Sequence, residues 1–151
     1  MIRDVEIKVL DNRAIIPSYA TEDSGGVDLV ACISKSIEVP PLENVLVSTG
    51  LAINMQTVIE RCIAMIVPRS GKGHKEGKVL GNTVGIIDQD YQGELLVSML
   101  NRNKEKYITV EPGERIAQLI FVPIIRASFK EVVNFSCATA RGAGGFGSTG
   151  S

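Results

Sequence analysis

The sequence predicts an all-β fold, a jelly-roll-like barrel with at most one or two short helices. Apolar residues recur with a period of two along most of the chain, and 15 glycines and 6 prolines divide it into short segments. Spacing typical of a helix is confined to two brief stretches. Short strands separated by turn residues are expected to close into a barrel or two packed sheets. The length of 151 residues fits one such domain.

The expected strands begin near the amino terminus, where three apolar residues alternate with two charged ones over 5–9. The same period recurs at 45–47 and at 107–110, which is typical of half-buried strands. Three longer apolar runs fit strands that are covered on both faces. These runs span Cys62 to Val67, Leu95 to Leu100 and Ile116 to Ile125.

Turn and helix signals fill the spaces between the strands. Pro123, inside the last apolar run, predicts a bend or an edge. The Glu-Pro-Gly-Glu stretch at 111–114 has the composition of a tight turn. The two helix candidates lie at 55–61 and directly after Ser70.

Composition excludes several classes of protein. Sixteen basic residues against 17 acidic ones give a net charge of −1, without the basic surface that polymeric nucleic acid requires. Cys32, Cys62 and Cys137 are odd in number and form no C-x-x-C pair, so we expect free thiols rather than disulfides or zinc. The charged amino terminus and the absence of a long apolar run indicate neither a signal peptide nor a membrane span. We therefore expect a soluble cytoplasmic protein.

The last eleven residues, 141–151, are rich in glycine and serine, and composition alone favours a flexible tail. Residues 142–147 match G-x-G-x-x-G literally, but the chain stops too soon for the helix that the dinucleotide motif requires. No lysine follows these glycines, which excludes a Walker A loop.

The stretch at 68–71, Pro-Arg-Ser-Gly, directly follows an apolar strand. Such a point offers a phosphate three kinds of donor: the arginine guanidinium, a hydroxyl and exposed backbone N–H groups. An Arg-Ser-Gly stretch is nevertheless more often a simple capped turn. The lysines that follow are expected in a solvated basic loop, and His74 on the surface. These lysines are Lys72, Lys75 and Lys78.

Residues 81–93 place Asp88 at the end of an apolar strand and an aromatic residue, Tyr91, three positions later. Two interpretations remain open from the residues alone. Asp88 either caps the turn of a hairpin or presents a reactive carboxylate.

Taken together, five segments in one order closely resemble the homotrimeric deoxyuridine triphosphate nucleotidohydrolases (dUTPases). The resemblance runs from Val5 to Gly150. The segments are Ala20 to Leu29 (ATEDSGGVDL), Pro68 to Gly71 (PRSG), Gly81 to Gly93 (GNTVGIIDQDYQG), Gly113 to Ile120 (GERIAQLI) and Arg141 to Gly150 (RGAGGFGSTG).

The resemblance implies Mg²⁺-dependent hydrolysis of dUTP to dUMP and pyrophosphate, which lowers dUTP and supplies dUMP for thymidylate synthesis. Asp88 matches the family's general base, and Gln118 a residue near the phosphates or the attacking water. Asp28 matches the carboxylate that orders the water shell of a Mg²⁺ held directly by the phosphates. The phosphate clamp matches Arg69, Ser70 and Gly71.

The resemblance also implies how the nucleoside is selected. The uracil is expected in a hairpin slot, and Tyr91 against the deoxyribose, where a 2′-hydroxyl would collide. The slot is formed by Asn82 and by Ile86 to Leu96, which includes Ile86, Ile87 and Leu96.

By the same resemblance the chain divides into a β-barrel catalytic domain, 1–140, and a flexible glycine-rich arm, 141–151, that closes over an active site of the homotrimer. Phe146 would stack on the uracil, and Arg141 would wrap the phosphates together with Gly147, Ser148 and Thr149. Each of the three sites is expected between subunits.

Two residues depart from the family pattern. Lys72 stands where an apolar residue is usual, and Gly25 where alanine is common. Two other functions remain to be weighed. A dCTP deaminase of the same fold would need a glutamate where this chain has Ser98. A non-catalytic binding protein could use the same scaffold, because a fold does not fix a function.

Overall fold

The computed structural model describes residues 4–58 and 61–145 and confirms the all-β class. Within these residues the elements follow one another as β1 Glu6–Val9, β2 Val27–Val30, β3 Ile37–Val39, β4 Asn44–Asn54, β5 Cys62–Pro68, α1 Ser70–Glu76, β6 Lys78–Leu80, β7 Gly85–Ile87, β8 Glu94–Asn101, β9 Ile108–Val110 and β10 Arg115–Pro123.

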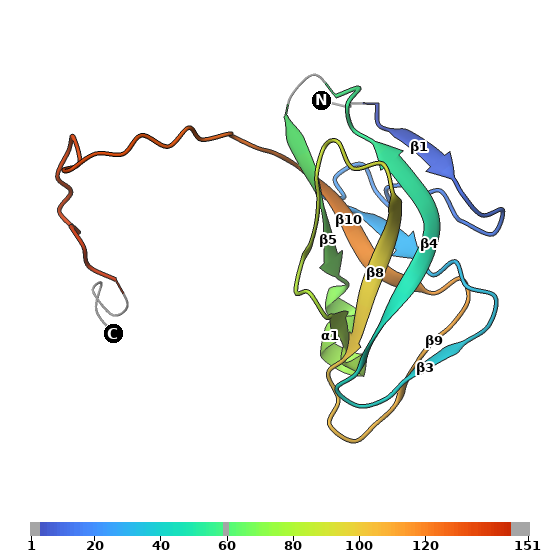
Figure 1. Cartoon of the computed structure of the whole chain (residues 1–151). Helices are drawn as coiled ribbons and strands as arrows, with labels where there is room; N and C mark the ends of the chain where they lie inside the picture. Colours follow the sequence, from blue (N-terminus) through green and yellow to red (C-terminus); the bar gives the residue numbers. More distant parts are fainter. Residues whose placement is uncertain (1–3, 59–60, 146–151) are drawn as a thin grey trace.

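Two four-stranded antiparallel sheets face each other (Figure 1). The first has the strand order β1-β4-β8-β6 and the second β2-β10-β5-β7. A separate ribbon of β3 and β9 lies at the end of the molecule near α1. Neighbours in a sheet are mostly distant in sequence, as expected for a jelly-roll-like barrel.

The core lies between the two sheets and receives alternate side chains from each strand. In β8, Leu95 and Val97 are each 1% exposed, whereas Leu96 between them is 42% exposed. β5 shows the same alternation of buried and half-buried residues. The prediction that these strands are covered on both faces is therefore wrong for the single chain, because each sheet packs on its partner with one face only.

The predicted turns and the last strand agree with the structure. The Glu114 N–H donates to the Glu111 carbonyl at 3.1 Å, which closes the turn, and Gly113 adopts the left-handed conformation there, with φ 76°. β10 ends at Pro123, consistent with an imino residue at a strand terminus.

One of the two helix predictions is correct. α1 begins at Ser70 as expected. The candidate at 55–61 is wrong in its described part, where the Val58 N–H donates to the Met55 carbonyl at 3.0 Å and closes a single turn. Residues 59 and 60 lie outside the described part. An isolated stretch this short forms too few hydrogen bonds to offset the free-energy cost of helix nucleation.

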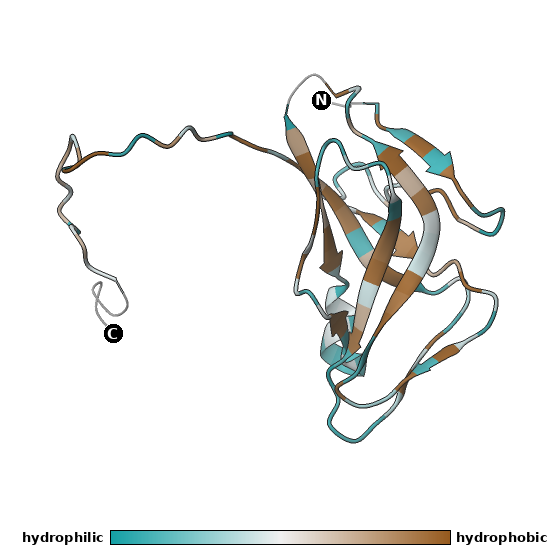
Figure 2. Cartoon of the chain, viewed as in Figure 1, coloured by the Kyte–Doolittle hydropathy of each residue, from teal (hydrophilic) through white to brown (hydrophobic). Residues whose placement is uncertain are grey.

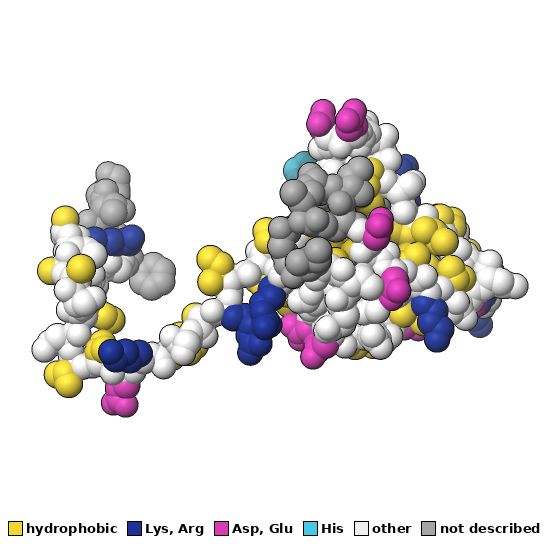
Figure 3. Space-filling model, turned by 90° about the horizontal axis from the view of Figure 1, so that it is seen from above, with side chains coloured by type: hydrophobic (Ala, Val, Ile, Leu, Met, Phe, Trp, Pro, Cys, Tyr) yellow, Lys and Arg dark blue, Asp and Glu magenta, His cyan; other side chains and the backbone are white. Residues whose placement is uncertain are grey.

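Beyond Pro123 the chain leaves the barrel as an extended segment without helix or strand over 124–145 (Figure 1). Brown apolar positions recur along it in Figure 2, and Figure 3 shows their side chains standing free of the barrel. Four of these side chains are 91% to 98% exposed: Ile125, Phe129, Val133 and Phe135. Large apolar groups at this exposure are typical of a surface that another chain covers.

Cys32 and Cys62 are buried and Cys137 is exposed, and no disulfide joins them in the described chain. Among the described residues no helix is long and apolar enough to cross a membrane.

Candidate active site

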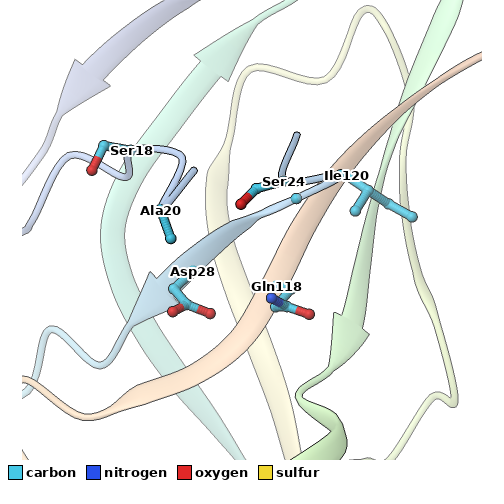
Figure 4. Close-up of a pocket in the computed structure, with 8 residues that line it drawn as sticks. Ser18, Ala20, Ser24, Asp28, Gln118 and Ile120 are labelled. Carbon is cyan, nitrogen blue, oxygen red and sulfur yellow. The ribbon is translucent and has the colours of Figure 1, made fainter. Parts of the chain in front are cut away.

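Three strands of the second sheet bring together a carboxylate, an amide and an arginine. Asp28 in β2 pairs in register with Gln118 in β10, and Gln118 pairs with Val67 in β5 on its other side. Figure 4 shows Asp28 and Gln118 side by side on neighbouring strands. Arg69 follows β5 directly. Residues from three of the predicted motifs therefore lie together at one place on the barrel.

The Asp28 carboxylate lies between two guanidinium groups. Arg69 Nε donates to Asp28 Oδ1 at 2.8 Å, and Arg115 Nη1 lies 3.4 Å from Asp28 Oδ2. Arg69 makes no other side-chain hydrogen bond within the described chain, so its terminal nitrogens retain their donors for an anion. We call Asp28, Arg69, Arg115 and Gln118 the arginine corner.

A β-bulge in β10 turns Arg115 outward. The register between β10 and β2 shifts between Arg115 and Ala117, so that Ile116 and Ala117 are both buried while Arg115 pairs with Val30 on the outer face. Without the extra residue, alternation would put the side chain of Arg115 on the face opposite Gln118. Arg115 was not singled out from the sequence, although a charged residue inside the GERIAQLI segment was a usable signal.

A hollow of about 500 Å³ adjoins the arginine corner (Figure 4). It is lined by Ser18, Ala20, Ser24, Gly25, Gly26, Asp28, Gln118 and Ile120. Gly26 is needed there, since a Cβ atom would lie 2.6 Å from Ile120 Cγ2. A Cβ on Gly25 would meet nothing within 4 Å, so the departure from alanine at Gly25 changes no contact.

Two lysines after the phosphate clamp are not solvated, contrary to the prediction. Lys72 Nζ lies 2.8 Å from Glu114 Oε1 and 2.9 Å from Glu76 Oε1. Lys78 Nζ, with its side chain 8% exposed, lies 2.6 Å from the same Glu114 oxygen. Glu76 is a local partner, but Glu114 is distant in sequence, and local composition could not reveal that contact. Lys75 and His74 are exposed as expected.

The segment from Asn82 to Leu96 does not form the hydrogen-bonded hairpin that the sequence predicts. β7 pairs with β5 in the second sheet, whereas β8 pairs with β4 and β6 in the first, so the chain crosses between sheets here. Residues 88–93 form the connection, which we call the 88–93 turn. Of the predicted slot residues, Ile87 packs against the core, whereas Asn82, Ile86 and Leu96 are exposed.

The Asp88 carboxylate is exposed and has no hydrogen bond or ion pair within the described chain. The turn is closed by the backbone instead, where the Tyr91 N–H donates to the Asp88 carbonyl at 3.0 Å. Within the described chain Asp88 is therefore not a capping side chain.

Tyr91 is held at a defined position on the surface. Its hydroxyl donates to the Glu94 carbonyl at 3.0 Å, and its ring passes so close to Gly93 that a Cβ there would collide with it. Glu94 is itself fixed, because its side chain accepts a hydrogen bond from Gly50 N at 2.9 Å. A ring 43% exposed and anchored in this way presents a rigid apolar face.

The arginine corner and Asp88 lie at opposite ends of β5. Ile87 pairs with Ala64 near the start of that strand, whereas Arg69 follows its last residue, Pro68. At about 3.3 Å per residue, Asp88 is about 16 Å or more from Arg69 along the strand. The two groups do not meet within one chain.

Arg141 lies in the extended segment, where its Nε donates to the Gly144 carbonyl at 3.0 Å. The structure does not bring it to the arginine corner. Phe146, Gly147 and Ser148 lie outside the described residues.

The two antiparallel sheets, with two guanidinium groups around Asp28, define an all-β protein of the jelly-roll-like class with a candidate site for an anion. The family described as dUTPase matches residues 12–150, nearly the whole chain. The chain belongs to the dUTPase family.

Relatives and solved structures agree with this assignment. The chain is 54% identical over 150 residues to the deoxyuridine 5'-triphosphate nucleotidohydrolase of Neisseria gonorrhoeae, covering 98% of this chain and 97% of that one. The Staphylococcus bacteriophage 80alpha dUTPase with dUPNHPP is similar with a TM-score of 0.86 and 26% identity, covering 99% and 100% of the two chains. A mutant dUTPase of phage phi11 of S. aureus, described with a structural Mg(II) ion, shares the fold with a TM-score of 0.77 and 20% identity, covering 89% and 100%.

Proposed function

We propose that this protein hydrolyses dUTP to dUMP and pyrophosphate with Mg²⁺. The observation that carries the proposal is the pairing of Asp28 with Gln118 on adjacent strands, with Arg69 bonded to the same carboxylate. Family membership supplies the substrate, since the Neisseria relative carries the name of that activity over nearly the same length.

Asp88 is the proposed general base. Its carboxylate is exposed and has no partner in the described chain, so it can accept a proton from the water that attacks the α-phosphorus. The P–O bond to the bridging oxygen breaks, and pyrophosphate leaves with the electron pair. Arg69 and Gln118 then face the charge that develops on the phosphates.

The residues present fit a Mg²⁺ ion that is held by the substrate. The described chain contains no group of three His, Cys, Asp or Glu side chains able to bind a metal, which argues against a site built from protein alone. Asp28 lines the hollow and would hold water of the ion's shell, because Mg²⁺ keeps several waters and binds phosphate oxygens. The ion would neutralise charge on the phosphates.

Selection of the nucleoside is assigned to the segment from Asn82 to Leu96. Tyr91 offers its fixed ring to the deoxyribose and excludes a 2′-hydroxyl by contact. Asn82 and the backbone beside Ile86 and Ile87 line the uracil slot.

We further propose a homotrimer whose sites are shared between subunits. Two observations support it. The distance between Asp88 and Arg69 requires a second chain for any site that uses both, and the bare apolar side chains between Ile125 and Phe135 need a partner surface. The arm at 141–151 would close over the site, with Arg141 and Phe146 reaching substrate.

Pyrophosphate release from dUTP, with dCTP, dTTP and UTP as controls, tests the proposal. We expect release from dUTP at a kcat/KM at least about 100-fold above each control. Ammonia release from dCTP would instead identify a deaminase, although Ser98 offers no base for that reaction. Tight binding of dUTP without pyrophosphate release would identify a non-catalytic binding protein.

A further inference from the structure

Helix α1, which carries Ser70 and Gly71 of the phosphate clamp, lacks an apolar anchor. It has seven residues, and Gly73 is the one that is buried. Helices of globular proteins normally pack an apolar stripe against the core, and seven residues with two glycines are unstable alone. The position of α1 therefore depends on polar contacts with neighbouring elements.

Polar contacts from neighbouring elements hold the helix, among them the ion pair of Lys78 Nζ in β6 with Glu76 Oε2 at 3.1 Å. At its far end the Asn103 amide donates to the Glu76 carbonyl at 2.8 Å, and in the middle Arg102 Nη2 donates to the Gly73 carbonyl at 2.9 Å. In its first turn Lys72 reaches Glu114, which directly precedes β10. The Lys72 contact is the one that connects the clamp end of α1 to the strand carrying Gln118.

The ion pair of Lys72 is well placed to act as such a connection. The side chains of Lys72 and Glu114 are 25% and 11% exposed. Glu114 also pairs with Lys78 Nζ at 2.6 Å and accepts a hydrogen bond from the Glu111 N–H at 3.0 Å. Burial alone would raise the pKa of Glu114, but hydrogen bonds from both lysines outweigh it and lower that pKa. Lys72, Lys78, Glu76 and Glu114 together carry no net charge, so Lys72 adds little field at the phosphates.

We propose that Lys72 is a positioning residue: through its ion pair with Glu114 it fixes the first turn of α1 against β10, and so holds Ser70 and Gly71 of the phosphate clamp in place relative to Gln118. The inference rests on the proposed function.

The test compares Lys72→Met with Lys72→Arg and with a matched control, Lys75→Met. Met keeps the stem of Lys72 without its charge, and Arg can restore the pair. Lys75 lies on the same helix with no ion pair in the described chain, so Lys75→Met removes an equal charge without removing an ion pair.

For Lys72→Met we expect KM for dUTP to rise about fivefold, with kcat within about twofold of wild type. Lys72→Arg should return KM to within about twofold of wild type, and Lys75→Met should leave it there.

Two further measurements distinguish a displaced phosphate clamp from a general loss of order in the whole site. Inhibition by deoxyuridine, which has no phosphates, should be unchanged in Lys72→Met, whereas binding of inorganic triphosphate, measured by calorimetry, should weaken about fivefold. Equal loss for deoxyuridine, an unchanged KM, or an equal effect of Lys75→Met would overturn the inference.

The triphosphate measurement does not depend on catalysis. If wild-type protein fails to cleave dUTP, the proposed function is wrong, while triphosphate binding still decides the role of Lys72. Should Lys72→Met fail to fold, Lys72→Gln is measured in the same way, with the same outcomes.

Discussion

The arginine corner and the 88–93 turn differ in how far a single chain completes them. The corner lies on three hydrogen-bonded strands, and its carboxylate is already bonded to Arg69. The turn connects two sheets and presents Asp88 without a partner in the described chain. A chain that holds Asp28 and Arg69 on paired strands and exposes Asp88 elsewhere fits the shared site proposed above.

The two regions also differ in what their side chains are free to do. Asp28 is ion-paired and part-buried, which suits fixed electrostatics, whereas Asp88 is exposed to solvent. If this division is correct, changes in the turn should reduce kcat or selectivity, and changes beside the corner should alter phosphate binding.

The largest effect is expected at Asp88. Asp88→Asn keeps the shape of the side chain but removes the proton acceptor, so kcat should fall by about 100-fold or more while the affinity for dUTP changes little. Steady-state rates together with binding of a non-hydrolysable analogue measure both quantities. An unchanged kcat would remove Asp88 from the mechanism.

A smaller effect is expected at Tyr91. Tyr91→Ala opens the space that the ring occupies, so the preference for dUTP over UTP, as a ratio of kcat/KM, should fall by at least about tenfold. Tyr91→Phe keeps the ring and serves as the control. A ratio that stays at the wild-type value in the alanine variant would assign sugar selection to another residue.

The smallest effect is expected at Gly93, which leaves room for the Tyr91 ring beside it. A methyl group in Gly93→Ala would displace the Tyr91 ring, so the preference for dUTP over UTP should fall by about threefold. Gly25→Ala, where the added methyl meets nothing within 4 Å, is the matched control. Equal selectivity in the two variants would mean that the ring need not be fixed.

The strands and the turn at 111–114 were predictable because their signals are local. A period of two marks the strands, and Pro-Gly marks the turn at 111–114. The contacts between segments were not predictable from spacing. Lys72 forms an ion pair with Glu114, which is distant in the sequence. Arg115 faces Asp28 because of a β-bulge that the composition of the segment does not indicate. The crossing of the chain between sheets at 88–93 also depends on pairing with distant strands.

In the proposed homotrimer, Asp88 and Arg69 of one active site come from different chains. Asp88→Asn and Arg69→Ala homotrimers should each be nearly inactive. The two proteins are denatured and refolded together in equal amounts, trimers are confirmed by sizing, and dUTP cleavage is measured. In a closed three-fold ring, about three quarters of randomly assembled trimers are mixed, and each of these has one intact site in three. About a quarter of wild-type activity should therefore return. Activity no higher than that of the separate variants would contradict a site shared between chains.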